Sequence, residues 1–321
     1  MKIVFLVWAN HSIRAQSISK HLGASLYLLS TSPIKHPMLF IRSLRILLKE
    51  RPSIIFCQSP PISCAFIAIV YGYLYNKKYR PKVLIDLHGI EGTWSKRISR
   101  CIMKCAHTTI VTNMELQNFL IANYNVKPII LEDPIPHLTL EQAPTNKKSN
   151  VKTSGTEFKL AVISSFAKDE PLQEILLAAS ELSDIQFFIT GNSRHVDNVE
   201  IRKKPPNVTF TGFLNYDDYI YLIQQMDAIM DLTTNDKTLV AGAYEAVALG
   251  QPLITSNWTP LRRYFNKGTV HVNNTHDDIK KAIRLTLERK EFLRKEMQEF
   301  RVKRMEEYER KISNLRNFLG I

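Results

Sequence analysis

The sequence lacks the short motifs that mark many nucleotide-binding and hydrolytic sites. It contains no GxGxxG fingerprint, no P-loop, no GxSxG nucleophile elbow and no Asp-x-Asp pair. Glycine-rich loops hold phosphates with backbone amides, and an Asp-x-Asp pair supplies carboxylate ligands for a metal ion. Their absence argues against kinases and against metal-dependent sugar transferases, and we expect no metal site.

Cysteine and long apolar runs are also scarce. The four cysteines form no CxxC pair, and no further His or Cys ligands accompany Cys101 and Cys105. The longest apolar run, Pro61–Tyr75, has about 15 residues, fewer than the ~20 that span a bilayer. Met1 and Lys2 lead directly into an apolar strand pattern, so no secretory signal is evident. We therefore expect reduced thiols in a cytoplasmic protein.

Positive charge is unevenly distributed along the chain. The formal net charge is +13, and residues 1–155 hold 20 Lys and Arg against 7 Asp and Glu, whereas residues 156–321 hold 23 of each. Such asymmetry favours an anionic partner, either a membrane surface, a nucleic acid or an acidic substrate, although a merely solvated basic face has the same composition. No nucleic-acid-binding module is recognisable, so we expect no nucleic acid partner.

The order of apolar and polar segments predicts an α/β fold. Strand patterns alternate with helix patterns in both halves, as in parallel sheets covered by helices on both faces. Between Pro134 and Thr156 the chain is polar and aperiodic, which predicts a linker. We expect two Rossmann-like domains facing each other across a cleft, at 1–150 and 156–304, with a terminal helix over 305–321 that can pack back on the first domain.

The segment Asp231–Ser256 has the order of a βαβ unit, with a strand, a polar loop, a helix closed by glycine and a second strand. Thr238 is placed to cap the helix, and Ala241–Ala243 leave its N-terminal amides open to an anion such as a phosphate. Glu245 follows about two turns after Thr238, where a carboxylate can accept both hydroxyls of a ribose. This pattern indicates a nucleotide site. The same residues also fit a close contact between helices and an ordinary solvated glutamate.

Polar residues in the first half follow the predicted strands. His88 follows Asp86 at the mouth of a strand, where it can act as a general base or a positioning donor. It can equally hydrogen-bond only its own loop. His11 and Arg14 follow the first strand and are placed to reach an anionic ligand, and we assign Glu91 to the same acceptor or phosphate side.

Several spaced segments of the second half resemble the donor domain of family-four GT-B glycosyltransferases, over roughly residues 158–275. The segments are 165–171, Thr190-Gly191, 207–214, 242–246 and 250–252, in that order. The first half resembles the acceptor domains of these enzymes only in layout. Asp86–Gly89 matches the place where they often keep a catalytic or positioning histidine.

The resemblance implies roles for individual residues. Glu245 would bind the ribose, Leu239–Gly242 would meet the diphosphate, and Lys168 would neutralise phosphate charge. Asp86 and His88 would be the catalytic residues. The base pocket would be lined by Thr211, Gly212, Phe213 and Leu214, and the remaining donor contacts would come from Ser165, Phe166, Thr190, Gly191, Thr234, Asp236, Lys237 and Thr238.

Two positions depart from the pattern of this family. The arginine that often precedes the phosphate-binding lysine is missing, and Lys237 stands where a glutamate usually lies eight positions before the ribose-binding one. We hypothesise that Lys237 meets a phosphate or an acidic sugar.

The function that the resemblance implies is hexosyl transfer from a nucleotide sugar, expected to be UDP-linked, to a lipid-linked or glycan acceptor in cell-surface polysaccharide or glycolipid synthesis. It implies a metal-independent, retaining reaction without a cofactor. The basic helix pattern over Met38–Arg51 favours peripheral binding to the inner face of a membrane. A nucleotide-sugar epimerase of GT-B fold and a non-catalytic donor-binding subunit remain alternatives.

Overall fold

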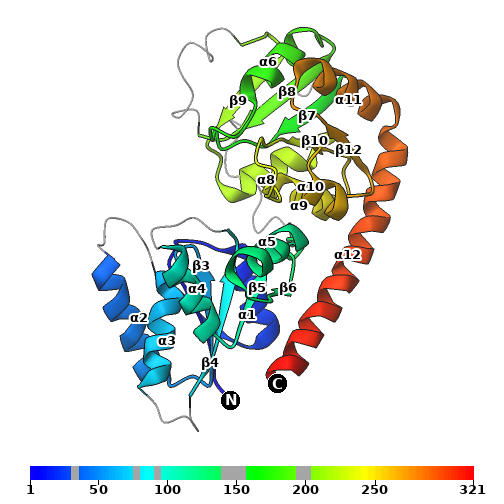
Figure 1. Ribbon diagram of the computed structural model, residues 1–321. Helices are drawn as coiled ribbons and strands as arrows, with labels where there is room; N and C mark the ends of the chain where they lie inside the picture. Colours follow the sequence, from blue (N-terminus) through cyan, green and yellow to red (C-terminus); the bar gives the residue numbers. More distant parts are fainter. Residues whose placement is uncertain (30–35, 75–79, 90–94, 139–156, 193–203) are drawn as a thin grey trace. The chain divides into compact units, whose positions relative to one another are not determined.

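The computed structural model describes residues 1–29, 36–74, 80–89, 95–138, 157–192 and 204–321 (Figure 1). Most of the predicted linker, from residue 139 to 156, lies outside the described residues. The chain divides into two compact units. Unit 1 comprises Met1–Pro134 and Glu306–Ile321, and unit 2 comprises Ile135–Met305.

Unit 1 is built on a six-stranded parallel sheet with the order β2-β1-β3-β4-β5-β6. Its strands are β1 (Ile3–Val7), β2 (Ser25–Leu28), β3 (Ile54–Ser59), β4 (Lys82–Leu87), β5 (Thr108–Val111) and β6 (Ile129–Ile130). Its helices are α1 (Ile13–Leu22), α2 (His36–Glu50), α3 (Ser63–Tyr73), α4 (Lys96–Cys105) and α5 (Met114–Tyr124), with the end of α12 (Lys290–Leu319).

Alternate residues of the strands in unit 1 face two separate apolar clusters. Val4 and Leu6 belong to a cluster with residues of α2, α3, α4 and α5, whereas Ile3 and Phe5 belong to a cluster with α1 and the end of α12. All five residues of β1 are buried as a result. Burial on both faces explains why the strands appear in the sequence as short apolar runs.

Unit 2 repeats this architecture with the strand order β12-β11-β10-β7-β8-β9, again parallel. Its strands are β7 (Phe158–Val162), β8 (Ile185–Thr190), β9 (Val208–Gly212), β10 (Ala228–Asp231), β11 (Leu253–Ser256) and β12 (Thr269–Val272). Its helices are α6 (Leu172–Ser180), α8 (Tyr216–Gln224), α9 (Ala241–Leu249), α10 (Thr259–Tyr264), α11 (His276–Glu288) and the first part of α12. Helices α6 and α11 pack on one face, and α8, α9, α10 and α12 on the other. The two sheets and their helices confirm the predicted α/β class.

One local expectation was wrong. Helix α9 begins at Ala241, and its N-cap is Val240 without a side-chain hydrogen bond, so Thr238 is not the cap. The charged C-terminal part of the chain forms two helices, α11 and α12, which meet at Arg289. The six-residue helix α10 was not anticipated. The expected glycine stop of α9 is present, since Gly250 has a φ of 68° that favours glycine.

Candidate functional site

The strand order in unit 2 reverses between β7 and β10, which are adjacent and parallel. Helix α6 follows β7 and α9 follows β10, and these helices pack on opposite faces of the sheet. The loops after the two strands therefore diverge, and ligands of open α/β sheets bind at such points. Most of the donor-binding residues predicted from the sequence lie in these loops and in the loops after β8 and β9.

The loop after β7 closes around the carboxylate of Glu170. The Ser165 amide donates to its Oε1 at 3.0 Å and the Phe166 amide to its Oε2 at 2.9 Å. The Ser165 hydroxyl donates to Oε1 at 2.7 Å, and the Ser164 hydroxyl donates to Oε2. Phe166 has a left-handed φ of 60°, and its ring lies 6.0 Å from that of Phe210. Ser165 and Phe166 were predicted from the sequence, but Glu170 was not.

The end of β8 fits tightly against this loop. A Cβ at Gly191 would lie 2.3 Å from the Ser164 carbonyl oxygen, and the φ of Gly191 is 119°, so no other residue fits there. The Ser164 amide donates to the Thr190 hydroxyl oxygen at 3.4 Å, and that hydroxyl donates to a carbonyl of β7. Thr190 and Gly191 therefore hold the loop, and both stay assigned to the donor site as predictions.

The polar loop after β10 is fixed by the segment after β7. The Thr233 hydroxyl donates to the Asp169 carboxylate at 2.9 Å, and the Thr234 amide donates to the Asp169 carbonyl at 2.6 Å. The Thr233 carbonyl accepts from the Trp258 indole at 2.7 Å and from the Asn274 amide at 2.8 Å. These contacts place Thr234 at the exposed edge of the loop.

The remaining residues of this loop approach α9. Asp236 and Lys237 are exposed, and Thr238 and Leu239 are half-buried. The Lys237 amide donates to the Asn235 side chain at 3.1 Å, which shapes a turn. Both side chains lie at the surface of the loop, and their contacts with the donor stay predictions.

Asp231, at the end of β10, is a buried carboxylate that sequence reasoning missed. Its Oδ2 accepts from the Gly242 amide at 2.7 Å. Burial, together with the negative charges of Glu245, Glu170 and Asp169, raises its pKa, and the Gly242 hydrogen bond opposes that rise. A Cβ at Gly242 would lie 2.7 Å from Asp231 Oδ2, so glycine allows the close approach. This corrects the prediction for Gly242, because its amide is directed at Asp231 and not at a diphosphate.

Glu245 lies in α9 and accepts a hydrogen bond from the Tyr219 hydroxyl of α8. Burial raises the pKa of Glu245 to about 7, and the Tyr219 hydrogen bond partly opposes this rise. The same burial and the neighbouring Glu245 raise the pKa of Tyr219. Glu245 is thus a carboxylate held in a defined position, which is compatible with the predicted ribose contact.

The loop after β9 presents an aromatic surface. Phe213 is 81% exposed, and Leu214 packs on the apolar cluster of α8 and α9. Gly212 has a φ of 69°, and the Thr211 hydroxyl donates to its carbonyl at 3.0 Å. The exposed ring of Phe213 offers a flat face on which a base can stack. Lys168 is also exposed and forms no hydrogen bond or ion pair with the residues that the structure describes.

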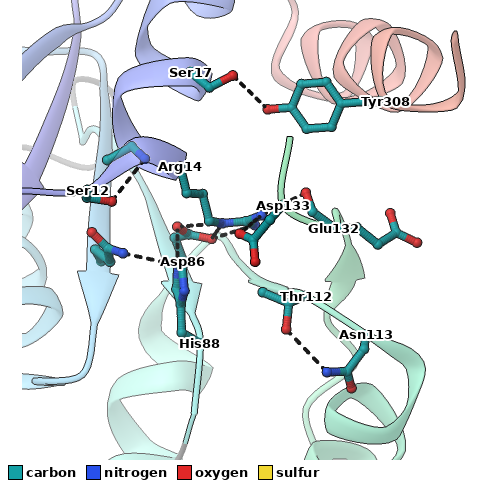
Figure 2. Close-up of polar contacts among 12 residues, drawn as sticks. Ser12, Arg14, Ser17, Asp86, His88, Thr112, Asn113, Glu132, Asp133 and Tyr308 are labelled. Carbon is teal, nitrogen blue, oxygen red and sulfur yellow. Dashed lines mark hydrogen bonds and ion pairs between the residues drawn. The ribbon is translucent and has the colours of Figure 1, made fainter. Parts of the chain in front are cut away.

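Arg14 and Asp86 of unit 1 form a buried ion pair (Figure 2). Arg14 Nε donates to Oδ1 and Oδ2 of Asp86 at 2.9 and 3.0 Å, and Nη2 donates to Oδ1 at 2.8 Å. Its Nη1 donates to the Glu132 carbonyl at 2.8 Å and to Asp133 at 3.2 Å. The Arg14 guanidinium holds the pKa of Asp86 below its usual range despite complete burial.

This pair corrects two predictions. Arg14 was expected to reach an anionic ligand, but its side chain is 3% exposed and its donors face residues of unit 1. Asp86 was assigned as catalytic, yet its side chain is 0% exposed and cannot touch a substrate. The burial of Arg14 could not be predicted from the neighbouring sequence, because its partner Asp86 lies 72 residues away.

His88 is an accessible neighbour of this ion pair. Its Nε2 lies 3.1 Å from Asp86 Oδ2 and 3.1 Å from Gln58 Nε2, and its side chain is 29% exposed. Asp86 raises the pKa of His88 against the opposing effect of burial. Asp86 thus orients His88 and stabilises its protonated form. His11 is exposed after β1, and Glu91 lies outside the described residues.

A family model places the chain among known enzymes. The model described as Glycosyl transferases group 1 matches residues 144–304, just over half of the chain. The chain belongs to this family. It is therefore a glycosyltransferase. No curated protein matches its sequence.

Solved structures resemble the whole glycosyltransferase. Sucrose-phosphate synthase of Thermosynechococcus elongatus has a TM-score of 0.77 and 12% identity, with 100% of this chain and 98% of that chain covered. Anabaena HepE in complex with UDP and glucose has a TM-score of 0.76 and 11% identity, with coverages of 100% and 99%. The UDP-GlcNAc 2-epimerase of Methanocaldococcus jannaschii has a lower TM-score of 0.58 and 14% identity, with coverages of 88% and 92%. These likenesses confirm the GT-B fold; membership of family four stays a prediction.

The part of the glycosyltransferase that the structure describes lacks two features. Among the residues that the structure describes, no three or more His, Cys, Asp or Glu side chains are grouped so that they could hold a metal ion. No helix of the described chain is both long and apolar enough to cross a membrane.

Proposed function

We propose that this glycosyltransferase transfers a hexose from a UDP-linked donor, held by unit 2, to a lipid-linked or glycan acceptor, with retention and without a metal ion. The proposal places it in the synthesis of a cell-surface polysaccharide or glycolipid. Its support is the family membership over unit 2 and the fold shared with HepE, whose structure contains UDP and glucose.

The observation that carries the proposal is the position of Glu245. Its carboxylate lies in the second turn of α9, at the point where the strand order reverses, and Tyr219 fixes its orientation. A carboxylate can accept hydrogen bonds from both hydroxyls of a ribose, and such charge-assisted bonds are strong. Phe213 is exposed after β9 and would stack on the base. The exposed Lys168 and Lys237 would stabilise the charge that develops on the leaving diphosphate.

Binding measurements test this donor site. Isothermal titration calorimetry of the whole chain with uridine, UDP and UDP-glucose should detect binding, and Glu245→Gln should weaken all three by about tenfold or more, because hydrogen bonds to a charged group are lost. Glu299→Gln, at an exposed position of α12, is the matched control and should change nothing. Absence of binding by the wild type would reject the donor site.

Product analysis separates transfer from epimerisation, the alternative suggested by the fold shared with an epimerase. The wild-type protein is incubated with UDP-GlcNAc or UDP-glucose in the absence of acceptor, and the sugar nucleotides are resolved by chromatography. Slow release of UDP and no epimer is the result expected of a transferase. Accumulation of a second UDP-sugar would favour the epimerase. Nucleotide binding with neither reaction, even after acceptors are supplied, would favour a donor-binding subunit.

We also propose that helix α2 docks unit 1 on an anionic membrane at the cytoplasmic face. Its exposed residues mix apolar and basic side chains: Met38, Ile41 and Leu48 with Arg42, Arg45 and Lys49. Positions 38, 41, 42, 45, 48 and 49 recur at helical spacing, so they share one side of the helix. Such a surface binds headgroups by charge and the acyl boundary by its apolar side chains.

Vesicle sedimentation tests this docking. The wild type should bind vesicles containing anionic lipid more strongly than neutral vesicles, and Arg42→Glu with Arg45→Glu should abolish the difference, since each basic residue contributes about 1 kcal/mol. The control replaces two exposed lysines of unit 2, Lys281→Glu with Lys295→Glu, and changes the net charge by the same amount. Equal binding by both double variants would contradict docking through α2.

A further inference from the structure

Glu170 occupies a position that is built for an anion. Two backbone amides, those of Ser165 and Phe166, and two hydroxyls, those of Ser164 and Ser165, all donate to its carboxylate. Phe166 adopts a left-handed conformation, which turns its amide toward the same point as the amide before it. Successive amides arranged in this way form a concave site for negative charge.

The surrounding strand ends hold this arrangement in place. The Ser164 carbonyl lies so close to Gly191 that a Cβ there would be 2.3 Å away, and the Ser164 amide is bound to Thr190. The loop is therefore fixed between β7 and β8 before any ligand arrives. The Glu170 carboxylate binds to a preformed set of donors, and does not merely cap a loose turn.

The carboxylates around Glu170 oppose a second anion at this point, whereas the exposed Lys168 and Lys237 favour one elsewhere in the loops after β7 and β10. Asp169 is the preceding residue. The negative charges of Glu245, Glu170 and Asp169 all raise the pKa of the buried Asp231, so these four carboxylates interact electrostatically. A nucleoside diphosphate adds at least two negative charges to this group of carboxylates. Because the amides of Ser165 and Phe166 already face Glu170, a diphosphate bound at the end of β7 would have to displace the carboxylate or lie next to it. Both cases weaken binding of the diphosphate and leave the nucleoside contacts unaffected.

We propose that the Glu170 carboxylate fills the amide site at the end of β7 and thereby lowers the affinity of unit 2 for the diphosphate part of the donor. In this role Glu170 determines which part of the donor unit 2 selects. The proposal rests on the donor site proposed above. It assigns recognition of the ligand chiefly to the nucleoside, through Glu245 and the exposed ring of Phe213.

Calorimetry with uridine and UDP on the whole chain tests this role. Glu170→Gln removes the charge and keeps the shape, and its amide nitrogen cannot accept from the loop donors, which frees them for a phosphate. We expect UDP to bind about tenfold more tightly to the variant, the factor corresponding to one charge-assisted hydrogen bond. Uridine affinity should change by less than about twofold, and Glu299→Gln should leave both affinities unchanged.

The outcomes distinguish this inference from the donor site itself. Unchanged or weaker UDP binding by a folded Glu170→Gln variant, with uridine binding retained, overturns the selectivity role and leaves the donor site standing. If neither uridine nor UDP binds the wild type, the donor site fails. The wild type alone provides a second test, should the variant not fold. UDP is expected to bind at most about tenfold more tightly than uridine, and a ratio of about a hundredfold or more, equal to two charge-assisted bonds, would contradict the proposal.

Discussion

The hydroxyl of Tyr219 donates a hydrogen bond to the carboxylate of Glu245, and the two residues are 26 positions apart on α8 and α9. This contact opposes the effect of burial, which raises the pKa of Glu245 to about 7. The ionisation of the proposed ribose-binding group therefore falls within the physiological range, and Tyr219 adjusts it.

The first prediction concerns the pH dependence of uridine binding. In the proposed site, ionised Glu245 would accept two hydrogen bonds from a ribose and the protonated group would accept them less well, so affinity should fall as the pH drops through about 7. Tyr219→Phe removes a hydrogen bond that favours the ionised form, and the midpoint should move to higher pH. Calorimetry between pH 6 and 8.5 measures both midpoints, and Tyr221→Phe on the same helix is the control. Identical profiles for Tyr219→Phe and wild type would show that Tyr219 does not influence Glu245.

The second prediction concerns the stability of unit 1. Arg14→Met leaves the Asp86 carboxylate buried without its partner and should lower the free energy of unfolding by about 3–5 kcal/mol. Arg14→Met combined with Asp86→Leu should recover most of this loss, since the fully buried carboxylate is removed together with its partner. Urea denaturation followed by circular dichroism measures the changes. An exposed pair gives the comparison: Lys280→Ala, which breaks the contact with Glu181, should lower the stability far less than Arg14→Met does.

The Arg14–Asp86 pair also determines how the stability of unit 1 changes at acid pH. Arg14 lowers the pKa of Asp86 in the folded state, so the stabilisation is complete above the unfolded value of about 3.9 and is lost as the pH falls below it. The double variant should lose less stability between pH 5 and 3 than the wild type. An equal loss would show that other carboxylates dominate the acid response.

The third prediction concerns the close approach of α9 to β10. Gly242→Ala places a Cβ 2.7 Å from Asp231 Oδ2 and 2.7 Å from Ile163 Cγ1, so either the helix or the strand must move. The expected cost is about 1–3 kcal/mol of unfolding free energy, and uridine affinity should fall because Glu245 lies in the same helix. Gly89→Ala is the matched control, because its Cβ would meet nothing within 4 Å. Equal stability of the two variants in thermal melts would contradict the tight fit.

The fold was largely predictable because parallel strands buried on both faces form short apolar runs such as β1 and β3. The features that were not predicted are either short elements or depend on contacts between residues far apart in the sequence. Helix α10 has six residues, too few to show a period, and no glycine or proline marks the junction of α11 and α12 at Arg289. Sequence spacing does place Glu245 in α9.

The polar contacts of the site were less predictable than its location. Asp231 and Glu170 look like solvated acids in the sequence, and only the packing of β7 against β10 shows that they bind backbone amides. The burial of Arg14 likewise depends on strand β4 lying beside β3 and β5, which presents Asp86 to it. The exposure of a lysine such as Lys168 is predictable because it depends only on the polar loop, and its contact with a phosphate stays a prediction.

The last prediction concerns His88. If it is a general base, replacement by glutamine should reduce release of UDP from UDP-glucose by about 10²–10⁴-fold and leave UDP affinity unchanged. A base must be neutral, and Asp86 raises the pKa of His88, so the wild-type rate should rise with pH through a midpoint above the ordinary value of about 6.5. A rate that falls with rising pH would instead identify protonated His88 as a positioning donor. His107→Gln, at an exposed histidine of unit 1, is the control for the substitution. Wild-type turnover in His88→Gln would show that the histidine only holds its own loop through Asp86 and Gln58.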